Sequence, residues 1–456
     1  HADNLFAQDP PTTGWRHRMT ITYDPKHGKY MDEADARNEM SRVFDVCHDC
    51  QRCIGLCPTF PTMFALIDRH DDHDAGRMTP SQQDHVVDQC YQCKLCYFNC
   101  PYTPEQSELA VDFPRLMLRA DAMRRANRQV SIRSRVTDTI VGHTDLVGRA
   151  ASMSVPFANK VVGAKPGSMV RKAVQITTGV SSVRLLPPYA RQRFTTWFKR
   201  RPRVRIVKRQ GRIAVFPTCT VEYQQPSIGH DLVKVYERNG IECSLVDGAT
   251  CCGAPSLHSG DVDHFTKVAE KNVKALAVAV RRGNDIVVPQ PTCGYVLKKE
   301  YVNYVGGADA AVVAEHTYDA AEYLMKVHQG AGTTLDTDFK GDVPATVTYH
   351  APCHLRAQNV GLKSRDLIML TGAKVTLVQQ CSGMDGTWGL RAENDEISLP
   401  IAEKLGDLIR TADSDVVAGD CHLANTAITE QTGEEPLHPL QLVARAYGIS
   451  EEVVQR

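Results

Sequence analysis

From Arg212 onward, the chain alternates short apolar runs with longer segments of helical periodicity. The apolar runs each hold four to seven strand-forming residues of the Val, Ile, Tyr and Phe type. They occupy residues 212–219, 241–248, 284–294, 310–316, 345–354, 373–383 and 415–421. Between them, residues 231–240 end at Gly240 and residues 262–283 end at Gly283, as helices commonly do. This alternation predicts an α/β architecture with mostly parallel sheets.

Short amphipathic helices are predicted in the middle of the chain. The stretch GSMVRKAVQITTGV places four apolar side chains on one helical stripe: Met169, Ala173, Ile176 and Val180. A second stretch, RFTTWFKRRPRVR, places Phe194, Trp197 and Phe198 at the helical spacing i, i+3, i+4.

This middle segment is also strongly basic. Residues 119–212 contain 22 Lys and Arg and only three acidic residues, although the formal net charge of the whole chain is zero. Basic helices that carry Trp and Phe suit the surface of an anionic membrane, with access to quinone. They suit equally well an acidic partner protein or the acidic remainder of this chain. Nucleic-acid binding is a third and weaker interpretation, because no recognised module supports it.

The bulk composition is that of a soluble globular protein, with 42% hydrophobic and 23% charged residues. The first residues lack the charged-then-apolar pattern of a secretory signal, so we expect a cytoplasmic protein that either stays in solution or attaches peripherally to the inner face of the membrane. We expect a multidomain α+β and α/β chain whose parts differ in composition. They are a flexible N-terminal segment (1–39), a module that holds the clustered cysteines described next (40–118), a basic amphipathic helical segment (119–211), a first α/β domain (212–342) and a second, degenerate α/β domain (343–456).

Two cysteine runs, at residues 47–58 and 90–101, share the spacing C-x2-C-x2-C-x3-C-P. Bacterial ferredoxins use this spacing for two [4Fe–4S] clusters, in which the fourth cysteine of each run completes the other cluster. The sequence therefore predicts one cluster bound by Cys47, Cys50, Cys53 and Cys100, and another bound by Cys90, Cys93, Cys96 and Cys57. Zinc favours paired CxxC knuckles with a longer gap between them, so two zinc sites are the weaker hypothesis.

A charged loop joins the two runs and contains His70, Asp71, Asp72, His73 and Asp74. These residue types can ligate a metal ion, but we expect a solvated loop, because no further residue that would orient such ligands can be named.

The C-terminal half repeats a cysteine pattern after its predicted strands. The first copy contains Cys219, Cys251, Cys252 and Cys293, and the second contains Cys353, Cys381 and Cys421. Open α/β sheets bind ligands at the carboxyl ends of their strands, so each set is expected to converge there. The adjacent pair Cys251–Cys252 suits a multi-iron cluster better than a tetrahedral zinc ion. We therefore predict an additional iron–sulfur cluster at the first copy.

Histidines crowd the second copy: His350, His354, His422 and His438. Three thiolates with imidazoles can hold a mononuclear metal ion, or a cluster with one open position of the kind that catalysis needs. An empty copy kept for the fold is the remaining alternative. The candidate catalytic residues are Cys353, Cys381, Cys421, His354 and His422.

The chain resembles the CCG-type, heterodisulfide-reductase-like iron–sulfur oxidoreductases from about residue 45 to its end. The resemblance rests on both cysteine runs and on GHTDLVG, RFTTWFKR, GHDLVKV, CCGAP, YHAPCHLRAQ, GMDGTWG and HPLQLVARA. Two branches are most similar: the iron–sulfur subunits of anaerobic glycerol-3-phosphate dehydrogenases and relatives associated with rubrerythrin. The second motif departs from the dehydrogenase pattern, with Ser382 after Cys381 and His422 after Cys421, which favours the rubrerythrin-associated branch.

This resemblance implies an electron-transfer protein between a flavoprotein or quinone-linked donor and a redox partner such as a rubrerythrin-type peroxidase. Three alternatives stay open: a component of a glycerol-3-phosphate-type dehydrogenase that feeds quinone, an enzyme that reduces a thiol, disulfide or peroxide at Cys353, Cys381 and Cys421, and an iron–sulfur redox sensor. No glycine-rich dinucleotide fingerprint follows a predicted strand, so we expect no tightly held NAD or flavin.

Overall fold

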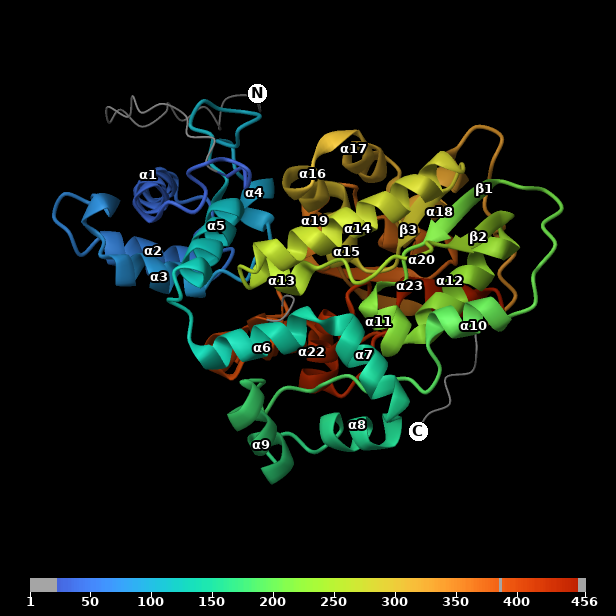
Figure 1. Cartoon of the computed structure of the whole chain (residues 1–456). Coiled ribbons are helices and arrows are strands. Elements are labelled where there is room, and N and C mark those ends of the chain that lie inside the picture. The colour runs from blue at the N-terminus through green and yellow to red at the C-terminus, as the bar shows by residue number, and fades with distance from the viewer. Residues whose placement is uncertain (1–22, 385–387, 450–456) are drawn as a thin grey trace, which may run out of the picture. The chain divides into compact units, whose positions relative to one another are not determined.

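The computed structural model describes residues 23–384 and 388–449, and the chain divides into two compact units, residues 1–127 and 128–456 (Figure 1). Each unit is described by itself. Among the described residues, no helix combines the length and the apolar character needed to cross a membrane.

The first unit is helical. Its elements are α1 (Glu33–Cys50), α2 (Thr59–Ile67), a 3₁₀ turn (Ala75–Arg77), α3 (Pro80–Asp88), α4 (Leu95–Phe98) and α5 (Phe113–Ala126). The starts of α1 and α3 are capped, since the side chain of Asp32 accepts the N–H of Asp35, and Thr79 and Gln82 form a capping box. The helices enclose an aromatic core in which the ring of Phe113 lies 4.9 Å from that of Phe60.

The expectation of a flexible segment over residues 1–39 is wrong for its described part. Helix α1 begins at Glu33, and Tyr30 is buried. The fully buried guanidinium of Arg119 donates hydrogen bonds of 2.8 Å to the carbonyl of Tyr30 and to the carboxylate of Asp35. A buried charge requires such partners, so α5 holds this segment in place. Residues 1–22 lie outside the described residues.

The second unit contains two parallel sheets, as the alternating pattern predicted. The first has the order β2-β1-β3-β4, built from β1 (Gly211–Val215), β2 (Ile241–Leu245), β3 (Asp285–Val288) and β4 (Thr317–Asp319). The second has the order β6-β5-β7, built from β5 (Thr346–His350), β6 (Lys374–Val378) and β7 (Val416–Gly419). Every cysteine motif of this half follows a strand of one of these sheets.

Helices connect the strands of both sheets. In the first half they are α11 (Thr218–Tyr223), α12 (Pro226–Arg238), α13 (Ala254–His258), α14 (Val262–Arg281), α15 (Pro291–Tyr295), α16 (Tyr301–Tyr304), α17 (Gly307–Glu315) and α18 (Ala320–Gln329), with a π-helical turn at Val296–Glu300. In the second half they are α19 (Cys353–Ala357), α20 (Lys363–Leu370), α21 (Asp395–Ala412), α22 (His422–Thr432) and α23 (Pro439–Ala446), with 3₁₀ turns at Trp388–Leu390 and Ala392–Asn394.

One predicted strand is wrong. Residues 310–315 lie in helix α17, and the strand β4 begins only at Thr317. Ala310 and Val313 are the buried positions of this helix, which is the spacing of a helical face and not of a strand. The run is rich in Ala, the best helix former, and only its valines favour a strand.

The two α/β halves share a hydrophobic cluster, although the second half also has clusters of its own around Val347 and Leu405. Leu367 of α20 and Leu440 of α23 pack in the same buried cluster as Ile213 and Val215 of β1. The predicted boundary at residues 342 and 343 therefore does not separate two independent cores.

The basic segment is not a separate unit either. Residues 119–126 belong to α5 in the first unit, while the rest forms α6 (Ile132–Gly142), α7 (Thr144–Met153), α8 (Val155–Val162), α9 (Met169–Thr178) and α10 (Phe194–Arg200) in the second unit. Polar contacts tie this layer to the second α/β half. The fully buried Arg184 donates to Glu430 over 2.7 Å, and the hydroxyl of Ser181 donates to Asp395 over 2.9 Å.

The two predicted amphipathic stretches have different environments. In α9, the side chains of Met169 and Ile176 are 88% and 74% exposed. In α10, the ring of Trp197 stacks on His230 at 3.9 Å, and Arg201 lies 4.3 Å over the ring of Phe198. The apolar face of α10 is thus part of the core, whereas the stripe of α9 faces solvent.

Candidate iron–sulfur sites

The first unit gathers its eight clustered cysteines around two small cavities. One cavity, of about 20 Å³, is lined by Cys47, Cys50, Cys53 and Cys100. The other, of about 10 Å³, is lined by Cys57, Cys90, Cys93 and Cys96. The structure therefore brings these residues together in the crossed groups that the spacing predicts.

Local backbone turns aim the cysteines inward. Gln51, directly after α1, has a φ of 50°, and Gln92 and Lys94 have φ values of 56° and 65°. Non-glycine residues rarely adopt this left-handed conformation, so the loops are held by their surroundings. The fourth cysteine of each run precedes a proline: Pro58 caps the start of α2, and Pro101 is among the residues that line the cavity of Cys47.

Burial, reinforced by repulsion from neighbouring thiols, raises the pKa values of several of these cysteines. The pKa values of Cys53 and Cys90 are raised to about 12, and that of Cys47 is raised well above its usual range. Four thiolates can therefore share such a cavity only with strong positive charge between them, which the irons of a cluster supply. The N–H of Tyr102 lies 3.4 Å from the sulfur of Cys100 and the amide of Gln92 lies 3.6 Å from that of Cys90, so donors to the sulfurs are already in place. The donor set fits two iron–sulfur clusters.

One aromatic side chain lines both cavities. Phe60 is buried in the core of the first unit and is among the lining residues of each cysteine group. The two cysteine groups are therefore neighbours that share one lining residue.

The first CCG site collects Cys219, Cys251, Cys252 and Cys293 at the carboxyl ends of β1 and β3 and after β2. Their thiols are linked pairwise, from Cys219 to Cys251, Cys251 to Cys252 and Cys252 to Cys293. These contacts lower the pKa of the Cys251 thiol well below its usual range, the contact with Cys219 contributing most. Four neighbouring thiols match the donor set of a cluster.

Gly253 makes the sharp turn after the cysteine pair possible. Its φ is +87°, and a Cβ at this position would lie 2.8 Å from the ring of Phe265. Both the backbone conformation and the space therefore demand glycine.

Three side chains that are distant in the sequence form hydrogen bonds with the backbone of Cys251 and Cys252. Asp145 accepts the N–H of Cys251 over 2.8 Å. Asn272 donates to the carbonyl of Cys251 over 2.9 Å, and the hydroxyl of Tyr301 donates to the carbonyl of Cys252 over 3.0 Å. The sequence pattern did not identify these three residues. The only signal was the GHTDLVG stretch that contains Asp145.

The second CCG site is a cavity of about 30 Å³ lined by Cys353, Cys381 and Cys421, together with His350, His354, Thr292 and Ser382. The Nδ1 of His354 and the hydroxyl of Thr292 lie 2.9 Å apart. Burial lowers the pKa of His350 to about 4.

The other two histidines named from the sequence, His422 and His438, do not line this cavity. His422 is buried beside Cys421 but is not among the residues that line the cavity, and burial lowers its pKa to about 4. His438 caps α23, because its side chain accepts the N–H of Leu440. Of the four histidines named from the sequence, the structure brings two to the cavity.

The two CCG sites are neighbours through α15. Cys293 belongs to the first site, and the preceding residue, Thr292, lines the second. Gln358 in the second half donates to the carbonyl of Pro291 over 3.1 Å, which fixes this helix against α19.

The charged loop of the first unit is largely exposed, as expected. Asp74 caps the 3₁₀ turn, and Asp72 pairs with Arg77 at 3.0 Å. His73 and His48 both contact the carboxylate of Asp68, at 3.1 and 2.9 Å. In this trio, His48 is half-buried, whereas Asp68 and His73 are exposed, and both imidazoles have the carboxylate of Asp68 as a hydrogen-bond partner.

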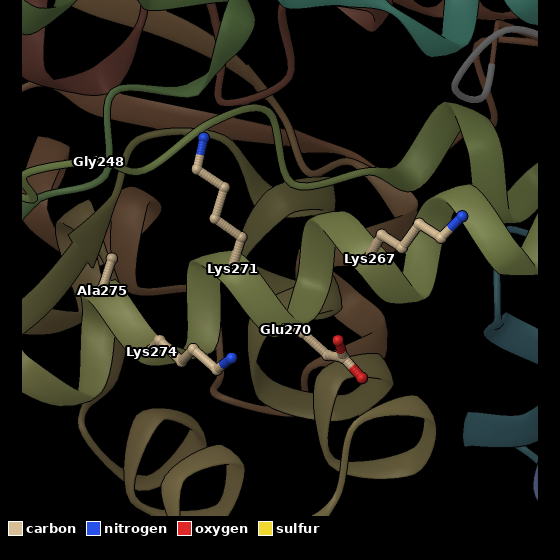
Figure 2. A pocket seen from close by; sticks show the side chains of 6 residues that line it. All are labelled: Gly248, Lys267, Glu270, Lys271, Lys274 and Ala275. Atoms are coloured by element: carbon tan, nitrogen blue, oxygen red, sulfur yellow. The ribbon is translucent and has the colours of Figure 1, made fainter.

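A shallow hollow of about 500 Å³ lies on the exposed side of α14, lined by Gly248, Lys267, Glu270, Lys271, Lys274 and Ala275. Figure 2 shows the amines of Lys267, Lys271 and Lys274 pointing in different directions. They do not converge on one ligand, so this hollow is a solvated helix face.

Known protein families match both parts of the chain. The 4Fe-4S dicluster domain matches residues 39–101, and the CCG cysteine-rich domain matches residues 213–298 and 347–427. A subunit of the anaerobic glycerol-3-phosphate dehydrogenase of Escherichia coli strain K12 is 28% identical over 331 residues, which are 72% of this chain and 81% of that protein.

Two further relatives cover smaller parts. A subunit of the fumarate reductase (CoM/CoB) of Methanothermobacter marburgensis is 29% identical over 239 residues, which are 51% of this chain and 45% of that protein. Lactate utilization protein A of Bacillus pumilus is 24% identical over 224 residues, which are 46% of this chain and 87% of that protein.

Proposed function

Because the chain belongs to the CCG-type iron–sulfur oxidoreductases, we propose that it is an electron-transfer component that takes single electrons from a flavoprotein dehydrogenase. It passes them through its clusters to an acceptor, either a quinone or a rubrerythrin-type peroxidase. Two relatives bear the names of subunits, one of a dehydrogenase and one of a reductase, which supports a role inside a redox complex.

The observation that carries this proposal is the shared position of Phe60. It lines the cavity of each cysteine group in the first unit, so two clusters bound there are close neighbours. Clusters held this close exchange single electrons, which suits a conductor better than a site of isolated chemistry. The shared helix α15 gives the two CCG sites the same kind of proximity.

We assign the cluster ligands from the cysteines that the structure brings together. Cys47, Cys50, Cys53 and Cys100 hold one [4Fe–4S] cluster, and Cys57, Cys90, Cys93 and Cys96 hold the other. Cys219, Cys251, Cys252 and Cys293 hold a third cluster. The remaining cysteine outside all sites is Cys243 on β2.

The test is anaerobic reconstitution followed by single-turnover kinetics. The reconstituted protein is expected to hold about eight irons in the N-terminal sites, and more when the CCG sites are loaded. A reduced flavoprotein donor should bleach its visible absorbance, and a soluble quinone or oxidised rubrerythrin should restore it. Cys90→Ser should remove one cluster, while the matched control Cys243→Ser should leave iron content and kinetics unchanged. A colourless protein with zinc at the N-terminal cysteines would overturn the proposal.

We also propose peripheral attachment to an anionic membrane through the helices α7 to α9. Met153 and Phe157, at the end of α7 and in α8, are 84% and 71% exposed, like Met169 and Ile176 in α9. Exposed lysines accompany them: Lys160, Lys165 and Lys172. The two acids in residues 128–191, Asp138 and Asp145, are engaged with Arg391 and Cys251. Apolar side chains among uncompensated positive charge suit a lipid surface with negative headgroups.

A further inference from the structure

The second CCG cavity contains an imidazole whose hydrogen bonding leaves one nitrogen available to a metal ion. His350 ends strand β5 and lines the cavity, and only 1% of its surface is exposed. Its Nε2 lies 2.9 Å from the carbonyl oxygen of Gln380. A carbonyl oxygen can only accept, so Nε2 carries the hydrogen and Nδ1 carries a lone pair.

That lone pair has no hydrogen-bond partner in the parts of the chain that the structure describes. Leaving a buried polar nitrogen without a partner destabilises the folded protein, so such an atom calls for a ligand. Histidines that ligate metals typically show this arrangement, because the second ring nitrogen donates to a carbonyl and fixes the tautomer. His350 therefore has the tautomer and the position of a ligand.

The neighbouring imidazoles are arranged differently. The Nδ1 of His354 is within hydrogen-bond distance of the Thr292 hydroxyl. The Nδ1 of His438 accepts a backbone N–H as a helix cap, and His422 is not among the lining residues. Among these four imidazoles, His350 is the one that lines the cavity and has a fully buried nitrogen without a hydrogen-bond partner among the described residues.

Resting on the proposed function, we propose that the second CCG site binds an iron–sulfur cluster through Cys353, Cys381, Cys421 and the Nδ1 of His350. Three thiolates and one imidazole also suit zinc. The proposed function favours a cluster here, because Thr292 of this cavity directly precedes Cys293 of the first CCG site, and an electron carrier would therefore have a neighbouring site to exchange electrons with.

The histidine ligand has an electronic consequence. A neutral imidazole in place of a thiolate makes the cluster less negative, which raises its reduction potential. Because Thr292 connects this cavity to the helix that carries Cys293, the first CCG site is the immediate electron donor. The second site is then the position where electrons collect before they reach the acceptor.

Pulsed EPR on the reduced holoprotein tests the proposal, because the other clusters have only cysteine ligands. We expect a nitrogen hyperfine coupling of a directly bound imidazole, which changes to the ¹⁵N pattern when the protein is made with ¹⁵N-histidine. His350→Ala should abolish this coupling, whereas His354→Ala, on the same cavity wall, should keep it. His350→Cys should retain the iron, lose the coupling and lower the midpoint potential of this cluster.

The labelled wild-type protein keeps the test valid if a variant fails to fold. Iron at the second site without nitrogen coupling would overturn the inference, as would zinc bound to Cys353, Cys381 and Cys421. A protein that holds the N-terminal irons but leaves the second site empty would refute this inference alone. Loss of iron from every site would instead refute the proposed function.

Discussion

The carboxylate of Asp145 accepts the backbone N–H of Cys251 over 2.8 Å and so ties helix α7 to the cysteine pair of the first CCG site. The hydroxyl of Tyr223 donates to the other carboxylate oxygen over 3.1 Å. Burial raises the pKa of Asp145, and both hydrogen bonds act against that rise. The basic helical layer is therefore part of the support of a cysteine site.

Replacing Asp145 should loosen that site selectively. Asp145→Ala leaves the N–H of Cys251 buried without its acceptor, which costs about 1–3 kcal/mol. We expect the iron of the first CCG site to fall, while the N-terminal irons stay. Iron per chain and urea unfolding measure the two effects. Asp247→Ala, an exposed aspartate four residues before Cys251, is the control and should change neither. If the iron content of Asp145→Ala equals that of the wild type, Asp145 does not stabilise the first CCG site.

Lys94 should set the potential of one N-terminal cluster. Its side chain is 2% exposed, lines the cavity of Cys57 and Cys90, and donates to Gln92 over 2.7 Å. A buried positive charge stabilises the reduced, more negative cluster. Lys94→Met should lower the midpoint potential of this cluster by on the order of 60 mV, a tenfold change in a one-electron equilibrium. EPR-monitored titration checks this value. Arg52→Met changes an exposed residue at the other cavity and should have a smaller effect.

The exposed side chains of α8 and α9 should govern binding to lipid vesicles. The double substitution Phe157→Ser with Met169→Ser removes two apolar contacts, each worth about 1.5–3 kcal/mol when fully buried. Cosedimentation with anionic vesicles should weaken at least about tenfold, given that each 1.4 kcal/mol is a factor of ten. Trp197→Ala should instead lower stability without changing vesicle binding, because Trp197 packs on His230. If the double variant binds vesicles as well as the wild type does, the exposed side chains of α8 and α9 are not the lipid-binding surface.

Short sequence patterns were sufficient to predict the cysteine groups of the first unit and most of the strands. The crossed cysteine groups follow from spacing within two short runs, and the structure places Cys57 and Cys100 in the cavities that the spacing predicts. Six of the seven predicted strands are present, because runs of β-branched residues after turn residues have few alternative conformations. The run at 310–316 failed because alanine and valine favour different structures.

Contacts between residues that are far apart in the chain could not be predicted from the sequence. Asp145 accepts a hydrogen bond from Cys251, which lies more than a hundred residues further along the chain, and no periodic pattern predicts this contact. The partial burial of Trp197 depends on its packing against His230, and the tautomer of His350 depends on the carbonyl of Gln380. Such relationships come from tertiary packing, which amphipathic patterns alone do not specify.

A buried pair of carboxylates should make stability depend on pH. Asp319 ends β4 and caps α18, and burial, reinforced by the nearby charge of Asp420, raises its pKa to about 8. Glu322 and Lys298 also face it, the first raising and the second lowering its pKa, and Tyr236 lies near. Because the folded-state pKa lies above the ordinary value near 4, the favourable contribution is complete below about pH 4 and is lost as pH rises towards 8.

Asp319→Asn tests this dependence without removing the helix cap, since the amide oxygen can still accept the N–H of Ala321. Wild-type stability should fall by at most about 1.4 kcal/mol per pH unit between pH 5.5 and 8 from this group, and the variant should lose that slope. The variant should therefore be more stable than the wild type at pH 8. Urea unfolding of the holoprotein under anaerobic conditions at several pH values provides the measurement. Parallel pH profiles for both proteins would show that Asp319 is ionised throughout this range and that the charge of Asp420 does not act on it.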